Sequence, residues 1–357
     1  MKITFVLPSL EIGGGVRVVF EHANRLRAKG HDVQIVYPLF PLDFGQPGNR
    51  IRLFIHRVRM FIDNLVQGNR VDWFDVTVPV CAVLFLDDCF VRDADIIIAT
   101  AWPTAYYVNR SAAQKGRKVY FIQHYEVVLG GGRLVDATYR MNLRQIVIAP
   151  WLEKLMVEKF GKSRPDLIPN GVNFKIFYNE HKTYHQPRRI LMLYSLSEWK
   201  GAADGIAAFE QARGKHPDVQ LVLFGRFKDR RVPPYAEFHI APQGEALRRL
   251  YCSGDIFLSP SWTEGWQLPP MEAMACKCAV VATNVGGIPH YTIAGTSALV
   301  CEPHRPDELA RQLIRLLDDP QLLASITEEG HRYITRFSWE AFSDQFEQSL
   351  ERIRASA

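Results

Sequence analysis

Short apolar segments recur along this chain, and helical spacing follows each of them. The first spans residues 3–7, after which a glycine loop at residues 13–15 leads into a helix that reaches Arg27. Gly30 ends this helix, and residues 33–37 form the next apolar segment. A strand without polar alternation is typical of a parallel sheet buried on both faces. The repeat therefore predicts an α/β chain with doubly wound sheets.

The repeat occurs in two sets, separated by a Pro/Asn/Gly turn at residues 167–173. A chain of 357 residues can form two domains, each with its own core. We therefore expect an N-terminal domain over residues 1–171, a C-terminal domain over residues 172–337 and a final helix within residues 338–357. Further strands are predicted at residues 95–99, 119–123 and 146–149 in the first set, and at 189–194, 221–225, 239–241, 256–259, 279–283 and 298–300 in the second.

Composition excludes several classes of protein. The net charge of +5 is too weak to indicate nucleic-acid binding, and the six cysteines form neither a disulfide framework nor a zinc pattern. No apolar stretch approaches the length of a membrane span. The first ten residues predict a strand and a loop rather than a secretion signal. We expect a cytoplasmic protein without a metal or other cofactor.

Residues 259–290 carry the most specific chemical signal. Glu264 and Glu272 stand eight residues apart, with the turn Gly265-Trp266-Gln267-Leu268 and a proline pair between them. A proline pair before a helix that begins near Met271 marks a helix start, and the free N–H groups there suit an anion. Carboxylates on either side can accept hydrogen bonds from sugar hydroxyls. A ligand with a diphosphate and hydroxyls, such as a nucleotide sugar, fits this pattern.

This segment resembles the donor-binding motif of the retaining glycosyltransferases of family four. The resemblance implies the GT-B fold, in which two Rossmann-like doubly wound domains face each other across a cleft and the C-terminal helix crosses back to the first domain. It implies that Glu264 acts at the donor sugar and that Glu272 binds the ribose. The turn at residues 265–268 would bind the donor diphosphate. Enzymes with this fold generally work without a bound metal.

The resemblance extends to the N-terminal half. Gly14 and Gly15 match a loop that faces the donor diphosphate, although a short glycine loop alone is also typical of a tight turn. His124 closes a predicted strand and matches a histidine that meets the donor sugar. The string YFIQHYE is similar to a polysaccharide-building subgroup, in which Glu126 would match a functional glutamate on the acceptor side. Gly131 lies in a glycine loop that would contact the acceptor.

A cation must stabilise the leaving diphosphate during sugar transfer. The family places an arginine and a lysine after the first strand of the second domain. Lys200 matches the lysine, whereas Ser195 occupies the position of the arginine. Arg226, which follows another predicted strand, is one substitute, and reliance on Lys200 with backbone donors is the other. Lys200 and Arg226 are also compatible with an ordinary solvated surface.

A basic amphipathic segment at residues 49–65 carries four arginines. It fits an interfacial helix on an anionic membrane near a lipid-linked acceptor, or a helix that packs on the core with one solvated face. The second interpretation is favoured. A peripheral contact with the inner face of the membrane is therefore a secondary expectation.

These features predict a retaining hexosyltransferase. Its donor would be a nucleoside diphosphate sugar, with a UDP-hexose such as UDP-glucose as the first candidate. Its acceptor would be a hydroxyl of a glycan or of a lipid-linked saccharide. Two alternatives are open: a nucleotide-sugar epimerase of similar architecture, and a non-catalytic nucleotide-sugar-binding paralogue. The missing arginine keeps the second of these in consideration.

Overall fold

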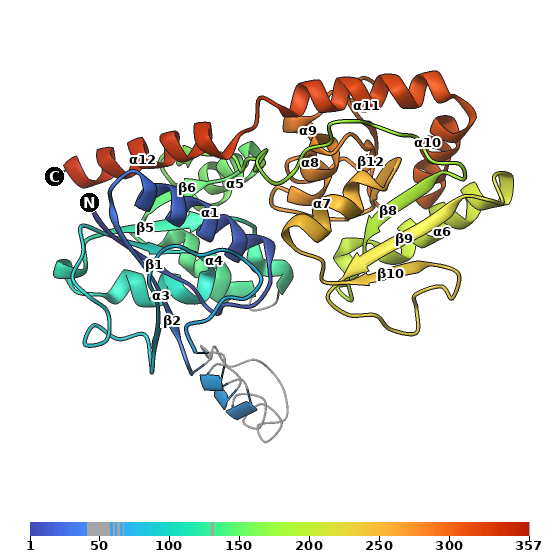
Figure 1. Ribbon diagram of the computed structural model, residues 1–357. Coiled ribbons are helices and arrows are strands. Elements are labelled where there is room, and N and C mark those ends of the chain that lie inside the picture. The colour runs from blue at the N-terminus through green and yellow to red at the C-terminus, as the bar shows by residue number, and fades with distance from the viewer. Residues whose placement is uncertain (41–57, 60, 63–64, 67, 130–131, 357) are drawn as a thin grey trace. The chain divides into compact units, whose positions relative to one another are not determined.

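The computed structural model describes residues 1–40, 58–59, 61–62, 65–66, 68–129 and 132–356. Two compact units divide the chain (Figure 1). Unit 1 consists of Met1–Pro169 together with Trp339–Ala357, and unit 2 consists of Asn170–Ser338. The chain therefore returns to the first unit with its last helix.

Unit 1 is built on a parallel sheet with the strand order β3-β2-β1-β4-β5-β6-β7. Its central strand β4 is buried throughout, as the uninterrupted apolar sequence predicts. The partly exposed edge strand β3 was not predicted, although it lies within the apolar run of residues 78–86. The strands are β1 (Lys2–Val6), β2 (Asp32–Pro38), β3 (Val80–Val83), β4 (Ile96–Ala99), β5 (Arg117–Ile122), β6 (Arg144–Val147) and β7 (Asp166–Leu167).

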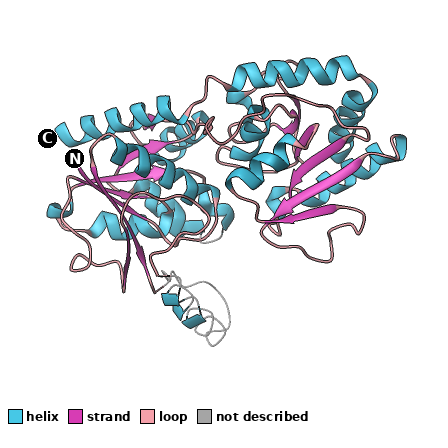
Figure 2. Cartoon of the chain, in the orientation of Figure 1, coloured by secondary structure: helices cyan, strands magenta, loops and turns pink. Residues whose placement is uncertain are grey.

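Helices pack around this sheet (Figure 2). They are α1 (Gly14–Ala28), α3 (Trp102–Arg110), α4 (Gly132–Arg140), α5 (Pro150–Phe160) and α12 (Trp339–Ala355), with the 3₁₀ turns η1 (Ala113–Lys115) and η2 (Glu126–Leu129). Helix α12 packs on α1 through an aromatic cluster. The buried His22 ring stacks on Phe346 with 4.3 Å between centroids and meets Trp339 edge-on at 5.3 Å. The aromatic spacing of the tail thus serves to dock it on unit 1.

Unit 2 contains a second parallel sheet, with the order β10-β9-β8-β11-β12-β13. The strands are β8 (Arg189–Leu193), β9 (Gln220–Gly225), β10 (Glu237–Ile240), β11 (Ile256–Ser259), β12 (Ala279–Thr283) and β13 (Leu299–Cys301). The helices are η3 (Glu198–Lys200), α6 (Ala202–Lys215), α7 (Gly244–Cys252), α8 (Leu268–Ala275), α9 (Ile288–Tyr291), α10 (Pro306–Asp318) and α11 (Pro320–Ile334). The expected class, two α/β units with parallel sheets, is confirmed.

Helix α8 begins three residues earlier than the sequence suggested. Its first residue is Leu268 rather than Met271, so Pro269 and Pro270 occupy the first turn instead of preceding the helix. With this start the first turn of α8 contains no acidic residue, because Glu272 lies one turn further in. Proline has a backbone dihedral suited to a first turn, which is why the helix can include both.

Candidate functional site

Lys200 and Glu264 form an ion pair after neighbouring strands of unit 2. Lys200 ends η3, which follows β8, and Glu264 lies in the loop after β11, the strand beside β8. The Lys200 Nζ is 2.7 Å from the Glu264 Oε1, and the Ser261 hydroxyl donates to the same oxygen at 2.9 Å. The side chain of Lys200 is 28% exposed and that of Glu264 is 10% exposed. The Lys200 ammonium group is therefore held in place and partly accessible. Two hydrogen bonds orient the Glu264 carboxylate beside it.

Close backbone packing brings the lysine loop to this position. Gly201 has a φ of 66°, and a Cβ there would lie 1.9 Å from the carbonyl oxygen of Pro260. Glycine is required on both counts, since other residues rarely adopt this dihedral and none fits the space. The Trp262 N–H donates to the Trp199 carbonyl at 2.7 Å, and the Trp262 indole donates to Asp204 at 2.7 Å. These contacts fix the loop after β8 to the end of β11.

Two further glycines, Gly286 and Gly287, pack closely against the turn between the two glutamates. A Cβ on Gly286 would come within 2.8 Å of the Glu264 Cβ, and one on Gly287 within 2.5 Å of the Trp266 carbonyl oxygen. The Trp266 side chain is buried and donates to the Met271 sulfur at 3.0 Å. Leu268 is buried as well. All four residues of the turn, Gly265 to Leu268, are therefore buried.

Gln267 caps helix α8 in a conformation that non-glycine residues seldom adopt, with a φ of 70°. Its side-chain oxygen accepts from Ser259 at 3.2 Å, and its carbonyl oxygen accepts from Tyr291 at 3.0 Å. Pro269 and Pro270 have no N–H group. The helix terminus therefore offers fewer donors to an anion than the sequence suggested, and the backbone before Pro269 would have to supply them.

Glu272, the second predicted donor-binding carboxylate, is 2% exposed on α8. The hydroxyl of Tyr251, which lies on the neighbouring helix α7, donates to the Glu272 Oε2 at 3.1 Å. Tyr251 was missed at the level of sequence, because nothing around it marks a ligand site. Ser261 was missed too, although its place three residues before Glu264 was visible. Both residues orient the carboxylates rather than add new charge.

The position of the family's arginine is a turn residue here. The Ser195 hydroxyl accepts from the Ser197 N–H at 3.2 Å. Arg226 follows β9, which is the other neighbour of β8, so it lies toward the same edge of the sheet. Its side chain is exposed, and its guanidinium lies over the Phe227 ring at 5.2 Å. The structure brings the side chains of Lys200 and Glu264 together, whereas the Arg226 side chain is exposed after β9.

In unit 1 the glycine loop lies next to the end of β5. Gly14 and Gly15 are exposed and form the first turn of α1. The amide of Gln123 donates to the Gly15 carbonyl at 3.1 Å, and a Cβ on Gly15 would touch that side chain at 3.4 Å. His124 follows directly; its Nδ1 is 3.0 Å from the Tyr125 carbonyl oxygen. The free N–H groups of the α1 terminus and a histidine thus share one edge of this sheet.

Glu126 points into unit 1. Its Oε2 accepts from the Trp102 N–H at 2.6 Å, at the start of α3, and from the Tyr120 hydroxyl at 3.3 Å. Burial raises the pKa of Glu126 to about 7, against the opposing effect of these hydrogen bonds. The family resemblance predicted Glu126 on the acceptor side, and that role stays a prediction. In the structure the Glu126 carboxylate binds the first N–H group of α3. A pKa near neutrality leaves it free to exchange a proton at physiological pH.

Two further expectations concern residues outside those described. Gly131 falls in a gap of the description, and so does most of the basic segment at residues 49–65. Within the described ranges, no helix is long and apolar enough to cross a membrane. The same part of the chain contains no group of three or more His, Cys, Asp and Glu side chains arranged to hold a metal ion.

Known structures share this fold. The crystal structure of HepE from Anabaena in complex with UDP-glucose superposes with a TM-score of 0.74 at 16% identity, and the match covers 99% of this chain and 100% of that chain. At that identity the likeness concerns the fold alone. It is the architecture of two parallel-sheet α/β units called GT-B.

Sequence relatives are glycosyltransferases. A D-inositol 3-phosphate glycosyltransferase of Thermobispora bispora is 34% identical over 117 residues, which are 32% of this chain and 27% of the relative. An uncharacterized glycosyltransferase of Methanocaldococcus jannaschii is 35% identical over 213 residues, or 56% of this chain and 57% of the relative. The chain thus matches only about a quarter to a little over half of the length of these relatives.

Two family models account for both units. The model of glycosyltransferase family 4 matches residues 12–175, and the model of glycosyl transferases group 1 matches residues 173–333. The chain belongs to the GT-B glycosyltransferases of the family 4 type.

Proposed function

We propose that this chain is a retaining glycosyltransferase that moves a hexose from a nucleoside diphosphate sugar to a hydroxyl of a glycan or lipid-linked saccharide. The observation that carries the proposal is the Lys200–Glu264 pair, 2.7 Å long, beside the turn that starts α8. A UDP-hexose is the first donor candidate. The complex of HepE with UDP-glucose supports that choice, because its fold is the same.

Lys200 is assigned to the leaving diphosphate. As the bond between the anomeric carbon and the phosphate oxygen breaks, negative charge grows on the diphosphate. A cation that is already fixed stabilises this charge without reorganising. Its carboxylate partner prevents the ammonium group from turning into solvent. The proposed reaction is metal-independent, because Lys200 and the backbone N–H groups of residues 265–268 would supply the positive potential.

Glu264 is assigned to the donor sugar and Glu272 to the ribose. Glu264 keeps one oxygen for Lys200 and Ser261, so its other oxygen is the one available to a sugar hydroxyl or to the growing positive charge on the anomeric carbon. Glu272 is already bound by Tyr251. Two ribose hydroxyls would enter that hydrogen-bond network as further donors. Arg226 is assigned to the rim of the donor site.

In unit 1, Gly14 and Gly15 are assigned to the donor diphosphate, and His124 to the donor sugar. Gly131 and Glu126 are assigned to the acceptor side. Glu126 fits a positioning role better than a direct contact, since its carboxylate is engaged with Trp102. Retention would proceed by attack of the acceptor on the same face of the sugar. The leaving phosphate would take the acceptor proton, so no protein nucleophile is needed.

The decisive experiment pairs donor binding with turnover. Titration calorimetry with a panel of nucleotide sugars identifies the donor, and an assay of donor hydrolysis and sugar transfer measures catalysis. Lys200→Ala is expected to lower turnover by roughly a hundredfold, the scale of losing one electrostatic stabiliser. Lys215→Ala, an exposed lysine at the end of α6, is the matched control and should retain full activity.

Other results would separate the alternatives. Interconversion of the donor sugar without an acceptor would indicate an epimerase. Donor binding with no turnover under any acceptor would favour a non-catalytic nucleotide-sugar-binding protein. If Lys200→Ala retained full turnover while Arg226→Ala lost most of it, the roles assigned to these two cations would have to be exchanged.

A further inference from the structure

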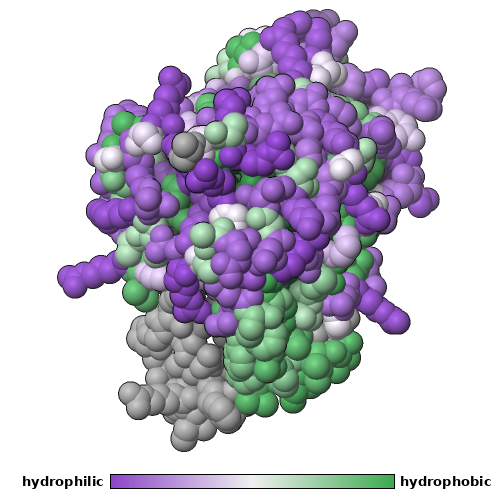
Figure 3. All heavy atoms as spheres, turned by 90° about the vertical axis from the view of Figure 1, so that its left-hand side faces the viewer, coloured by the Kyte–Doolittle hydropathy of each residue, from purple (hydrophilic) through white to green (hydrophobic). Residues whose placement is uncertain are grey.

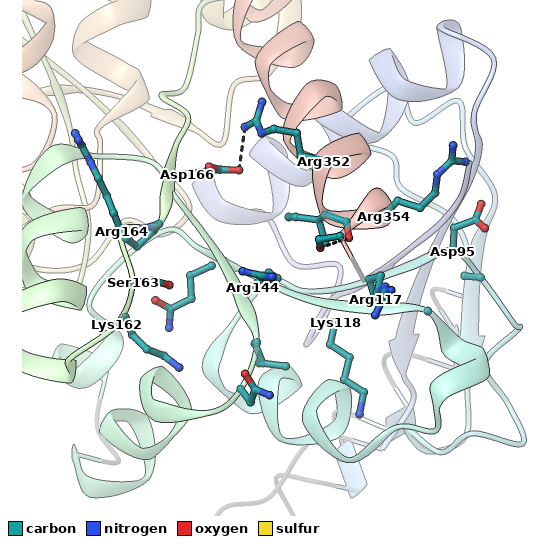
Figure 4. Close-up of a pocket in the computed structure, with 18 of the residues that line it drawn as sticks. Asp95, Arg117, Lys118, Arg144, Lys162, Ser163, Arg164, Asp166, Arg352 and Arg354 are labelled. Atoms are coloured by element: carbon teal, nitrogen blue, oxygen red, sulfur yellow. Dashed lines mark hydrogen bonds and ion pairs between the residues drawn. The ribbon is translucent and has the colours of Figure 1, made fainter.

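A pocket of about 1000 Å³ lies at the opposite edge of the unit 1 sheet from the glycine loop and His124 (Figure 4). Its walls come from the amino-terminal ends of β4, β5, β6 and β7 and from the last residues of α12. Ligands of α/β sheets usually bind at the carboxyl ends of the strands. The site proposed for the sugar donor does not account for this pocket.

Positive charge dominates the lining. Only two carboxylates accompany the cations, Asp95 and Asp166. The face that carries the end of α12, on the left of Figure 1, is turned to the viewer in Figure 3 and is mostly hydrophilic. The seven cations of the lining are Arg117, Lys118, Arg144, Lys162, Arg164, Arg352 and Arg354.

Both carboxylates of the lining are already engaged. Asp166 accepts from Arg352 at 3.1 Å, and Asp95 accepts from the backbone N–H of Lys2 at 2.6 Å. Arg164 is paired with Glu153 at 2.6 Å. For Arg117, Arg144 and Arg354, by contrast, no ion pair with a carboxylate occurs among the residues described. Within the described part of the chain, the charge of these three arginines thus has no carboxylate counter-ion.

Arg117 and Arg144 are held on the same face of the sheet. They begin the adjacent parallel strands β5 and β6, and Arg144 lies opposite Val119 in the register. Since side chains alternate along a strand, Arg117 shares its face with Val119 and hence with Arg144. Figure 4 shows both side chains in the view of the end of α12, and the Lys162 ammonium on another wall donates to the Met141 carbonyl at 2.5 Å. The strands thus place two exposed arginines on one face of the sheet, at the pocket.

We propose that this pocket binds a ligand with at least two phosphate or sulfate groups. A guanidinium group presents paired N–H donors that match the oxygens of such an anion, and two fixed groups can hold two anionic centres. A ligand with a single weak charge would leave most of the lining uncompensated. The shared chemistry fits a free polyphosphate and equally a phosphorylated lipid headgroup, and the experiment separates these two sources.

Compensation of the α12 helix dipole explains only some of the cations that line the pocket. Arg352 and Arg354 lie in the last turn of α12, where cations offset the negative end of the helix dipole. Arg117 and Arg144 begin strands, and a strand has no comparable dipole. These two arginines are therefore the positions that test the proposal.

The experiment compares the full-length protein with the double variant Arg117→Gln/Arg144→Gln. Inorganic tripolyphosphate is titrated by calorimetry at physiological salt, and vesicles of phosphatidylcholine with or without phosphatidylinositol phosphate are used in a flotation assay. Arg27→Gln/Arg230→Gln is the control, since it removes two exposed arginines that lie outside the pocket. Circular dichroism verifies that both variants are folded.

One-to-one binding of tripolyphosphate to the wild-type protein is expected, with at least a tenfold loss of affinity in the double variant and less than a threefold loss in the control. Flotation that requires phosphatidylinositol phosphate and the two pocket arginines, without tripolyphosphate binding, would support the site and identify a lipid headgroup as its ligand. Absence of both interactions, or equal losses in the double variant and the control, would overturn the proposal. Donor binding and sugar transfer are measured separately, so this result is independent of the proposed enzymatic activity.

Discussion

Replacing Glu126 with glutamine should make the protein more stable at neutral and alkaline pH. The carboxylate sits against the start of α3, where its Oε2 accepts from the Trp102 N–H at 2.6 Å. A glutamine side chain keeps an oxygen for that N–H group and never carries a charge. The substitution therefore isolates the cost of holding an ionised carboxylate in this enclosed position.

The size and sign of the effect follow from the raised pKa. Glu126 has an ordinary pKa of 4.5 in the unfolded chain and a pKa of about 7 in the folded one. Between these values the folded state binds more protons, so the free energy of unfolding of the wild-type protein falls as the pH rises. At about 1.4 kcal/mol per pH unit, the loss across this window is at most about 3.5 kcal/mol. Glu126→Gln lacks this loss, and its advantage should grow up to about pH 7 and then stay constant.

Urea unfolding from pH 4.5 to 8.5, followed by circular dichroism and tryptophan fluorescence, measures this difference. Other titrating groups, including the buried His22, cancel when the variant is compared with the wild type at each pH. Glu180→Gln, an exposed carboxylate in unit 2, controls for the loss of one acidic group. A stability difference that does not change with pH would refute the argument, because it would mean that the carboxylate ionises as easily in the folded state as in the unfolded one.

Three further substitutions test other parts of the structure. Gly201→Ala should destabilise unit 2 by about 1–3 kcal/mol, since its Cβ would lie 1.9 Å from the Pro260 carbonyl oxygen. Gly214→Ala, in an open helical position, should stabilise unit 2 by about 0.5–1 kcal/mol; thermal unfolding measures both, and equal effects would contradict the packing argument. Glu272→Ala should weaken donor binding by roughly 1.5–3 kcal/mol in calorimetry, and unchanged affinity in a folded variant would remove Glu272 from the donor site. Burial lowers the pKa of His22 to about 3, so the wild-type protein loses stability as the pH falls below 6.5. The free energy of unfolding of His22→Phe should rise relative to that of the wild type by up to about 1.4 kcal/mol per pH unit from pH 6.5 down to 4. Acid unfolding curves that stay parallel for the two proteins would disprove this.

The fold class could be predicted from the amino-acid sequence, because the signals for it are local. Uninterrupted apolar runs, such as that of β4, predict buried parallel strands, and the glycine loop before α1 predicts the turn that starts a helix. The aromatic spacing from Trp339 likewise predicts the final helix, which the structure confirms. Edge strand β3 was not predicted although its four residues are also apolar, so an apolar run does not by itself identify a strand.

Which chemical groups meet depends on tertiary packing and could not be predicted from local sequence. Lys200 and Glu264 are 64 residues apart, and they touch because β8 and β11 are neighbours in the sheet and because Gly201 lets the two loops approach. Strand order results from how whole layers pack, which no local pattern encodes. The direction of a side chain is decided in the same way. The sequence predicted a role for Glu126 but not the direction of its side chain: in the structure its carboxylate accepts from the Trp102 N–H at the start of α3, where the helix dipole favours an anion.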